Sequence, residues 1–129
     1  SEGARLAVDS GSDALIVSNH GGRQLDGAPS SIHALPEIVA AGGHEIEVHF
    51  DGGIRSGQDV LKAVALGARG TYIGRSMLYG LGAMGEAGVA KALSIIHNEL
   101  DLTMAFCGHT QISTVDRRIL LPDAIYANK

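Results

Sequence analysis

Cysteine and tryptophan are almost absent from this 129-residue chain, which has one cysteine, Cys107, and no tryptophan. A single thiol cannot form an internal disulfide, and this cysteine usage fits a reducing compartment. Aromatic residues make up only 4% of the sequence, whereas apolar residues make up 45%. The core must therefore be largely aliphatic, as is typical of α/β proteins, and the length suits one domain.

Long apolar runs and an excess of positive charge are also missing. No segment reaches the roughly 18 consecutive apolar residues of a membrane-spanning helix, and no signal-peptide pattern opens the chain. The formal net charge of −4 disfavours a nucleic-acid partner. We therefore expect a cytoplasmic α/β protein without a transmembrane segment, and peripheral membrane association stays open.

Helical and extended patterns alternate along the chain. Short, branched apolar segments predict parallel strands, the first of them buried, and glycines mark the ends of the helices between them. The predicted strands are 14–17, 45–50 and 70–73, and the predicted helices include 2–9 and 57–66. A further short helix starts near Ser30 or Ser31, has a restart at Pro36, and ends at Gly42 and Gly43.

Capping signals support these boundaries. Ser1 is in place to cap the first helix, and Ser56 with Asp59 has the spacing of a capping box. The last helix is predicted from an apolar stripe, and Gly108 follows it as a C′ residue. The stripe consists of Val89, Leu93, Ile96, Leu100, Met104 and Cys107. The tail, 111–129, is irregular and partly apolar, so we expect it to pack against another element.

A faint internal repeat connects the first and third units. Ala7-Val8 precedes Gly11 with the same spacing at which Ala63-Val64 precedes Gly67, and each match stands before a strand. Such helix–strand repeats build doubly wound sheets and (β/α)₈ barrels. A barrel has eight strands and usually about 250 residues. Three strands in 129 residues therefore predict the last three-eighths of a TIM barrel, about strands six to eight.

The loop after the first strand combines a candidate base with a candidate anion clamp. It reads Ser-Asn-His-Gly-Gly-Arg-Gln-Leu-Asp over 18–26, with His20 and Arg23 three positions apart. Histidine titrates near neutral pH and can accept a proton. The arginine fork can hold a carboxylate through two hydrogen bonds. Site logic alone leaves His20 open between a catalytic base and a structural hydrogen-bonding residue.

Two later strand ends carry glycine together with arginine. The first is the Asp51–Gly57 segment, with Arg55, and the second is Gly74-Arg75. Glycines after a strand let backbone amides approach a phosphate, and a following helix N-terminus favours an anion. In TIM barrels the phosphate site commonly lies after strands seven and eight. We therefore predict a phosphate site here rather than two plain surface turns.

The histidines do not predict a metal site. His49 and Asp51 alternate on a strand, and His33 and His44 lie in flanking segments. Zinc sites usually show paired ligands at short helical or loop spacings, and no such spacing occurs. We expect no bound metal.

With these motifs in view, the chain resembles the FMN-dependent 2-hydroxy-acid oxidising family, which includes glycolate oxidase, L-lactate dehydrogenase and mandelate dehydrogenase. The resemblance extends from about residue 4 to residue 121. Its most specific part is SNHGGRQLD over 18–26, supported by DGGIRSGQDVLKAVALGA over 51–68 and YIGRSMLYGL over 72–81. The second and third segments are less specific, because other phosphate-binding barrels carry similar ones.

The resemblance implies a role for each matched residue. His20 is the implied active-site base, and Arg23 holds the substrate carboxylate. Ser18 and Gly21 lie near flavin and substrate. The residues implied to bind the FMN phosphate are Asp51, Gly53, Arg55, Gly74 and Arg75. The implied reaction oxidises an L-2-hydroxy acid, with L-lactate as first choice, to the 2-oxo acid. The electron acceptor stays open among oxygen, quinone and cytochrome. The resemblance also implies that the full-length protein is a homo-oligomer.

The resemblance also places other active-site parts of the family, including an electrophilic lysine and the carboxylate that supports the base, before Ser1. Residues 1–129 are thus expected to be a partial FMN hydroxy-acid dehydrogenase domain. One alternative is a non-catalytic fragment with weak flavin or phosphate binding at most. Another is a nucleotide-oxidising barrel similar to inosine-monophosphate dehydrogenase. The second alternative needs a catalytic cysteine in a loop, whereas Cys107 is expected on a helix.

Overall fold

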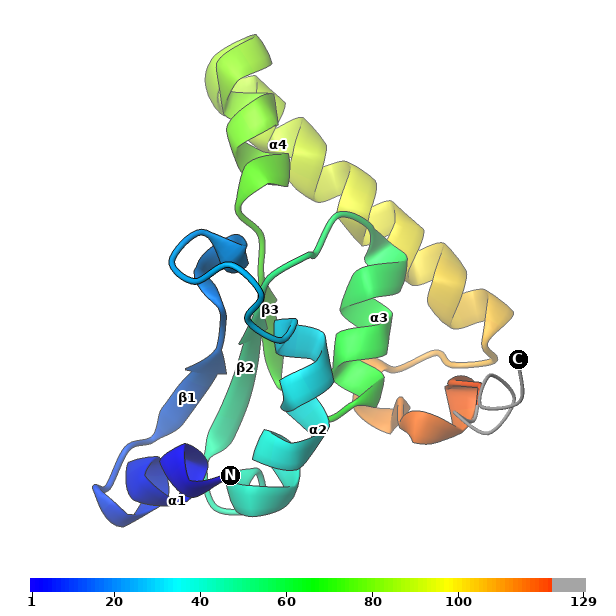
Figure 1. Ribbon diagram of the computed structural model, residues 1–129. Helices are drawn as coiled ribbons and strands as arrows, with labels where there is room; N and C mark the ends of the chain where they lie inside the picture. The colour runs from blue at the N-terminus through cyan, green and yellow to red at the C-terminus, as the bar shows by residue number, and fades with distance from the viewer. Residues whose placement is uncertain (122–129) are drawn as a thin grey trace, which may run out of the picture.

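The computed structural model describes residues 1–121. Its three strands, β1 (Ala14–Val17), β2 (Glu47–Asp51) and β3 (Gly70–Tyr72), form one parallel sheet in the order β1-β2-β3. The helices are α1 (Glu2–Asp9), α2 (Ser31–Gly42), α3 (Gly57–Ala65) and α4 (Arg75–Phe106). Figure 1 shows α2 and α3 side by side next to the sheet, while the long α4 extends beyond it. The predicted order of strands and helices is confirmed, and strand boundaries shift by one or two residues.

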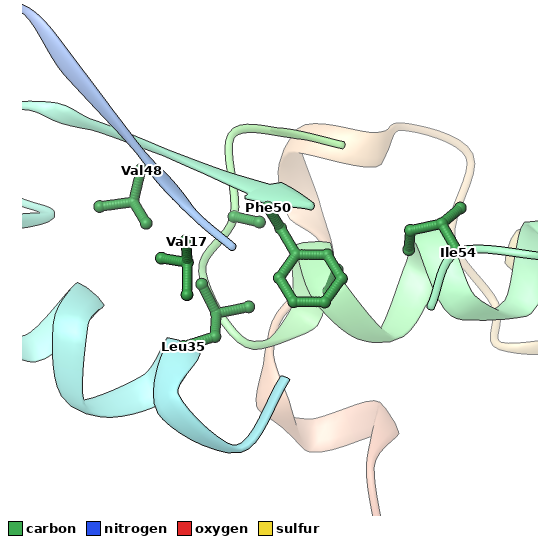
Figure 2. Close-up of a cluster of buried hydrophobic side chains, with 7 residues drawn as sticks. Val17, Leu35, Val48, Phe50 and Ile54 are labelled. Carbon is green, nitrogen blue, oxygen red and sulfur yellow. The ribbon is translucent and has the colours of Figure 1, made fainter. Parts of the chain in front are cut away.

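One face of the sheet carries the main core. Val17, Val48 and Phe50 point from the strands toward Leu35 of α2 and Ile54, as Figure 2 shows. Leu35 is fully buried and Phe50 is 1% exposed. This largely aliphatic cluster, with Phe50 as its aromatic member, holds the helices on the sheet, and burying a large side chain of this kind contributes about 1.5–3 kcal/mol.

The opposite face of the sheet is open, which corrects the prediction of a fully buried first strand. Ile16 of β1 is 54% exposed and Tyr72 of β3 is 46% exposed. Side chains alternate along a strand, so Ile16 points away from the face that Val17 covers. Ile16 pairs in register with His49, and Asp51 pairs with Tyr72. The run at 14–17 is apolar on both faces, although the helices cover only one of them.

The repeated sequence before Gly11 and Gly67 corresponds to a repeated helix end. At α1 the amides of Gly11 and Ser12 bond to the carbonyls of Val8 and Ala7. At α3 the amides of Gly67 and Ala68 bond to Val64 and Ala63 in the same way. Both ends are Schellman motifs, in which glycine adopts a positive φ at little cost. Gly108 ends α4 through the same pair of bonds, so its predicted C′ position is confirmed.

The predicted details of the starts of α1 and α2 need correction. Helix α2 continues through Pro36 without a restart, because Leu35 and Ile38, on either side of the proline, both pack on the same core. Ser1 and Ser30 occupy N-cap positions, but neither side chain makes a capping hydrogen bond. The capping box of α3 is confirmed, since Ser56 Oγ accepts from the Asp59 amide and Asp59 Oδ2 accepts from the Ser56 amide.

Helix α4 consists of two arms, 75–83 and 86–106, separated by non-helical torsions at Met84 and Gly85. The first arm was not predicted from the sequence. The arms meet where a Cβ on Gly88 would stand 1.8 Å from the Gly80 carbonyl oxygen. The apolar stripe is only partly confirmed: Ile96 and Met104 are buried, whereas Leu93 is 52% exposed and Cys107, now the C-cap residue, is exposed.

The tail packs on α3 and α4, as predicted for its described part. Val115 joins a second cluster with Leu61, Ala65 and Met104. Ile119 and Leu120 pack against that cluster. The rest of the predicted tail, 122–129, lies outside the described residues.

Candidate functional site

The predicted site residues come from three segments that follow neighbouring parallel strands. Because such strands end at the same edge of a sheet, their loops are brought together there. The loop after β1 contains the short 3₁₀ turn His20–Gly22, the segment after β2 contains Gly53 and Arg55, and β3 leads directly into Gly74 and Arg75. Figure 1 shows these connections above the sheet.

Ser18 connects the first of these loops to β2. Its Oγ donates to Asp51 Oδ2 at 2.6 Å and accepts from the His20 amide at 3.1 Å. A hydrogen bond to an ionised carboxylate is stronger than one between neutral groups. The Asp51 carboxylate thus holds Ser18, and Ser18 holds the backbone of His20.

His20 has an unusual backbone conformation. Its φ is +54°, and within residues 1–121 it is the only non-glycine residue with a positive φ. Gly21 and Gly22 follow with φ of +67° and +73°. A non-glycine residue in the left-handed region costs about 1–3 kcal/mol, and such strain concentrates at functional sites. The loop therefore holds its histidine in a conformation that local preferences do not favour.

The side chains of His20 and Arg23 are available to a ligand. Both residues are exposed, and no hydrogen bond or ion pair engages either side chain among the described residues. The turn between them closes through the Arg23 amide, which donates to the His20 carbonyl at 3.4 Å. Asn19 anchors the loop by donating from Nδ2 to the Pro29 carbonyl at 3.2 Å.

A cavity of about 420 Å³ lies among the segments that follow the three strands. Its lining brings together Gly21, Gly53 and Arg75, one from each of the three segments. Arg75 lies close to the first loop, since a Cβ built on Gly21 would stand 3.7 Å from Arg75 Nη2. The other predicted site residues do not line this cavity. They are Ser18, His20, Arg23, Asp51, Arg55 and Gly74.

The two helix N-termini near the cavity differ in how their amides are satisfied. At α3, Asp59 Oδ2 accepts from the amides of Arg55 and Ser56, and Glu99 Oε2 of α4 accepts from the Gly57 amide at 2.9 Å. Carboxylates thus already occupy the helix N-terminus that the sequence offered to an anion. At α4, the N-cap is Gly74 and no side chain caps the helix. The first amides of a helix have no partner within it, so this end favours an anion.

Several cavity residues were not predicted from the sequence. Asn19, Ser31, Asp59 and Lys62 all line it. Lys62 and Asp59 lie on α3, where helical spacing identifies an exposed face but does not identify the cavity beside it. The sequence identifies Ser31 only as a helix cap, because its burial at the cavity depends on the packing of α2 under the loop after β2.

His49 contacts a carboxylate and a phenol of neighbouring residues. Its Nε2 lies 3.0 Å from Glu47 Oε2, and its Nδ1 lies 3.3 Å from the Tyr72 hydroxyl. Over residues 1–121, no group of three or more histidine, cysteine, aspartate or glutamate side chains is arranged to hold a metal ion. Over the same residues, no helix combines the length and the apolar composition that crossing a bilayer requires.

Comparison with known proteins gives one consistent family. Residues 1–122 match the family model described as FMN-dependent dehydrogenase. Glycolate oxidase 1 of Oryza sativa subsp. indica is 50% identical over 123 residues, which cover 95% of this chain and 33% of that protein. L-lactate oxidase of Nostoc sp. is 50% identical over 117 residues, covering 91% of this chain and 32% of that protein.

Solved structures agree with this assignment. Mandelate oxidase with benzoyl-formic acid superposes with a TM-score of 0.86 at 48% identity, over 90% of this chain and 35% of that one. The α/β unit with its parallel sheet therefore matches part of a TIM-barrel oxidase. The chain spans about a third of the length of the curated relatives it matches. A family model that covers nearly all of the sequence, together with relatives at half identity, shows that the chain belongs to the FMN-dependent dehydrogenase family.

Proposed function

We propose that this chain carries the base, the carboxylate clamp and the cofactor-phosphate site of an enzyme that oxidises an L-2-hydroxy acid to the 2-oxo acid. The observation that carries the proposal is the loop at 18–26, in which Asp51 and Ser18 hold a strained His20 at the strand ends with its side chain exposed. The named substrates of the relatives, glycolate, L-lactate and mandelate, are all 2-hydroxy acids. L-lactate is our first choice.

The residues at the α4 N-terminus fit the phosphate of FMN. Gly74 leaves open space, since a Cβ built on it would meet nothing within 4 Å, and the same is true of Gly53. The Arg75 guanidinium supplies a charge beside the first amides of α4. Arg55 is exposed and adds a second cation. In this proposal Gly53, Arg55, Gly74 and Arg75 bind the phosphate.

Asp51 has a structural part in the same proposal. Its carboxylate is committed to Ser18 at 2.6 Å. A carboxylate placed against a phosphate would repel it, so the favourable role of Asp51 is to position Ser18 and the loop. In this proposal Ser18 and Gly21 lie near the bound cofactor and substrate.

FMN, when bound, accepts the two electrons that the substrate loses. The chain's own residues handle the substrate. Arg23 binds its carboxylate through two hydrogen bonds, which fixes the α-carbon relative to the loop. The neutral imidazole of His20 then accepts the proton released from the substrate. The hydrogen bond from the His20 amide to Ser18 Oγ holds the backbone from which the imidazole projects.

We further propose that residues 1–129 are a partial domain corresponding to strands six to eight of the barrel. The match to about a third of each relative and the open sheet face support a partial domain. The same observations favour a second candidate for the isolated polypeptide, a non-catalytic unit with weak flavin or phosphate binding. The inosine-monophosphate-dehydrogenase alternative loses support, because Cys107 lies at the C-cap of α4, away from the strand-end loops.

Flavin retention and bleaching test the proposal. The chain is incubated with FMN, desalted and given L-lactate without oxygen, while absorption near the flavin bands is recorded. Retained flavin that bleaches supports catalysis by this chain, and peroxide formed after air is admitted identifies oxygen as the acceptor. Retained flavin that stays oxidised supports the phosphate site alone. No retained flavin contradicts cofactor binding by the isolated chain.

The Arg75→Ala variant tests the phosphate site directly. We expect its FMN dissociation constant to rise at least tenfold, because a charge-assisted hydrogen bond contributes about 1.5–3 kcal/mol. The matched control is Arg117→Ala, an exposed arginine of the tail. Flavin fluorescence titration measures both. Equal affinities in the two variants would contradict the assignment of Arg75.

A further inference from the structure

The open face of the sheet carries a hydrogen-bonded chain of three side chains. Glu47 Oε2 lies 3.0 Å from His49 Nε2, and His49 Nδ1 lies 3.3 Å from the Tyr72 hydroxyl. The rings of His49 and Tyr72 also face each other, with centroids 5.8 Å apart and planes inclined by 33°. We call Glu47, His49 and Tyr72 the open-face triad.

The triad leads toward the candidate site. Glu47 and His49 are two residues apart on β2, so both point to the open face, as does Asp51 two residues further on. Tyr72 is the register partner of Asp51 on β3. Asp51 in turn accepts from Ser18. The triad therefore extends from Glu47, at the N-terminal end of β2, toward the C-terminal strand ends, where Ser18 and Asp51 hold the His20 loop.

The chemistry of the triad fixes the direction of its hydrogen bonds. An ionised carboxylate can only accept, so Glu47 requires a proton on His49 Nε2. In the neutral imidazole this leaves Nδ1 as an acceptor, and the Tyr72 hydroxyl must donate to it. The other charged groups nearby are Asp51 and Arg69, whose Nε lies 3.9 Å from Glu47 Oε1. The carboxylate thus sets the imidazole tautomer, and the tautomer sets the direction of the phenol.

We propose that Glu47 and His49 are positioning residues that fix Tyr72, and that Tyr72 is a contact residue for the bound cofactor at the rim beside Asp51. Tyr72 is suited to this because the residue is 46% exposed while its hydroxyl is hydrogen-bonded to His49 Nδ1. A fixed aromatic ring gives contact area without the cost of ordering it on binding. The cofactor role rests on the proposed function, whereas the hydrogen-bond order of the triad does not.

The order of the triad is tested by nitrogen NMR of the imidazoles in the full 129-residue chain. We expect His49 to show the Nε2-protonated tautomer at pH 8, and Glu47→Gln to abolish this preference. Glu86→Gln, on the exposed surface of α4, is the matched control and should leave it unchanged. An averaged His49 tautomer in the unsubstituted chain would overturn the proposal.

The cofactor role is tested by FMN titration of His49→Phe and Tyr72→Phe. His49→Phe keeps an aromatic ring but removes the acceptor, so we expect the dissociation constant to rise about three- to tenfold. Tyr72→Phe keeps the contact ring but frees it, and we expect a similar rise. Unchanged affinity in both variants, with the tautomer order intact in the parent chain, would overturn the role of Tyr72. If the parent chain binds no FMN but shows the expected His49 tautomer, the cofactor role of Tyr72 is overturned for this chain, whereas the hydrogen-bond order of the triad stands.

Discussion

At the residue scale, the site depends on Ser18 more than its short side chain suggests. Among residues 1–121, it is the one group that hydrogen-bonds both the Asp51 carboxylate and the His20 amide. Sequence spacing predicts that Ser18 and His20 lie near each other, and the family resemblance implies that Ser18 lies near flavin and substrate. The bond to Asp51 joins residues 33 positions apart, so it depends on the register of β1 with β2 and could not be obtained from local patterns.

Replacing Ser18 by alanine tests this linking role. The change leaves Asp51 with one partner fewer and the His20 amide without its acceptor, and because both hydrogen bonds are exposed we expect a loss of about 0.5–1.5 kcal/mol. We expect the Ser18→Ala chain to unfold at lower urea concentration and to lose the single loop conformation. Circular dichroism in urea and amide exchange at His20 measure the two effects. Ser113→Ala, in the exposed tail, is the control, and equal midpoints for the two variants would contradict the linking role.

The division of labour between His20 and Arg23 gives a second prediction at this scale, for a protein in which the proposed oxidation is measurable. Arg23→Met removes the carboxylate clamp, so substrate affinity should fall at least tenfold while FMN stays bound. His20→Gln removes the proton acceptor, so FMN reduction should slow by about 10²–10⁴-fold with flavin retained. Stopped-flow reduction separates the two effects. Fast reduction in His20→Gln would exclude it as the base.

At the element scale, the sequence predicts where helices end but does not predict which helical segments pack against each other. The glycine after α1, α3 and α4 has a local cause, the positive φ of a Schellman end, so the sequence alone predicts those three stops. The first arm of α4 was missed because four glycines between residues 80 and 88 weaken its helical pattern. Two of them, Gly80 and Gly88, let the arms cross closely. This contact crosses the non-helical break in α4, so local helix patterns do not reveal it.

Two alanine substitutions in α4 separate packing from helix propensity. In Gly88→Ala the new Cβ would stand 1.8 Å from the Gly80 carbonyl oxygen, whereas at Gly82 a Cβ would meet nothing within 4 Å. We expect Gly88→Ala to lower the free energy of unfolding by about 1–3 kcal/mol, as overpacking does. Gly82→Ala should raise it by about 0.5–1 kcal/mol, because alanine favours the helix. Urea unfolding measures both, and a stabilised Gly88→Ala would contradict the crossing of the arms.

The contrast between the two helix N-termini also belongs to this scale. Sequence motifs place glycine and arginine before both α3 and α4, which makes both look suited to a phosphate. The structure separates them, because Asp59 accepts from the Arg55 amide just before α3 and Glu99 accepts from the Gly57 amide at its first residue. Asp59 is visible in the sequence as a capping residue. Glu99 is not, since it reaches Gly57 from 42 residues away.

At the scale of the whole molecule, the open face of the sheet has consequences for the isolated chain. Within residues 1–121, β1 and β3 each pair with one strand only. On the open face, Ile16 of β1 is 54% exposed. Unpaired strand edges and exposed apolar side chains favour association. We expect this chain to bind a hydrophobic dye and to self-associate with rising concentration, which sedimentation velocity measures.

Ile16→Lys should weaken association about tenfold, because covering a half-exposed isoleucine contributes about 1–2 kcal/mol. Leu6→Lys is the matched control, since Leu6 is 60% exposed on α1, away from the open face. A chain that stays monomeric at all concentrations without binding dye would show that the open face needs no partner, and equal weakening by the two lysines would place the contact elsewhere.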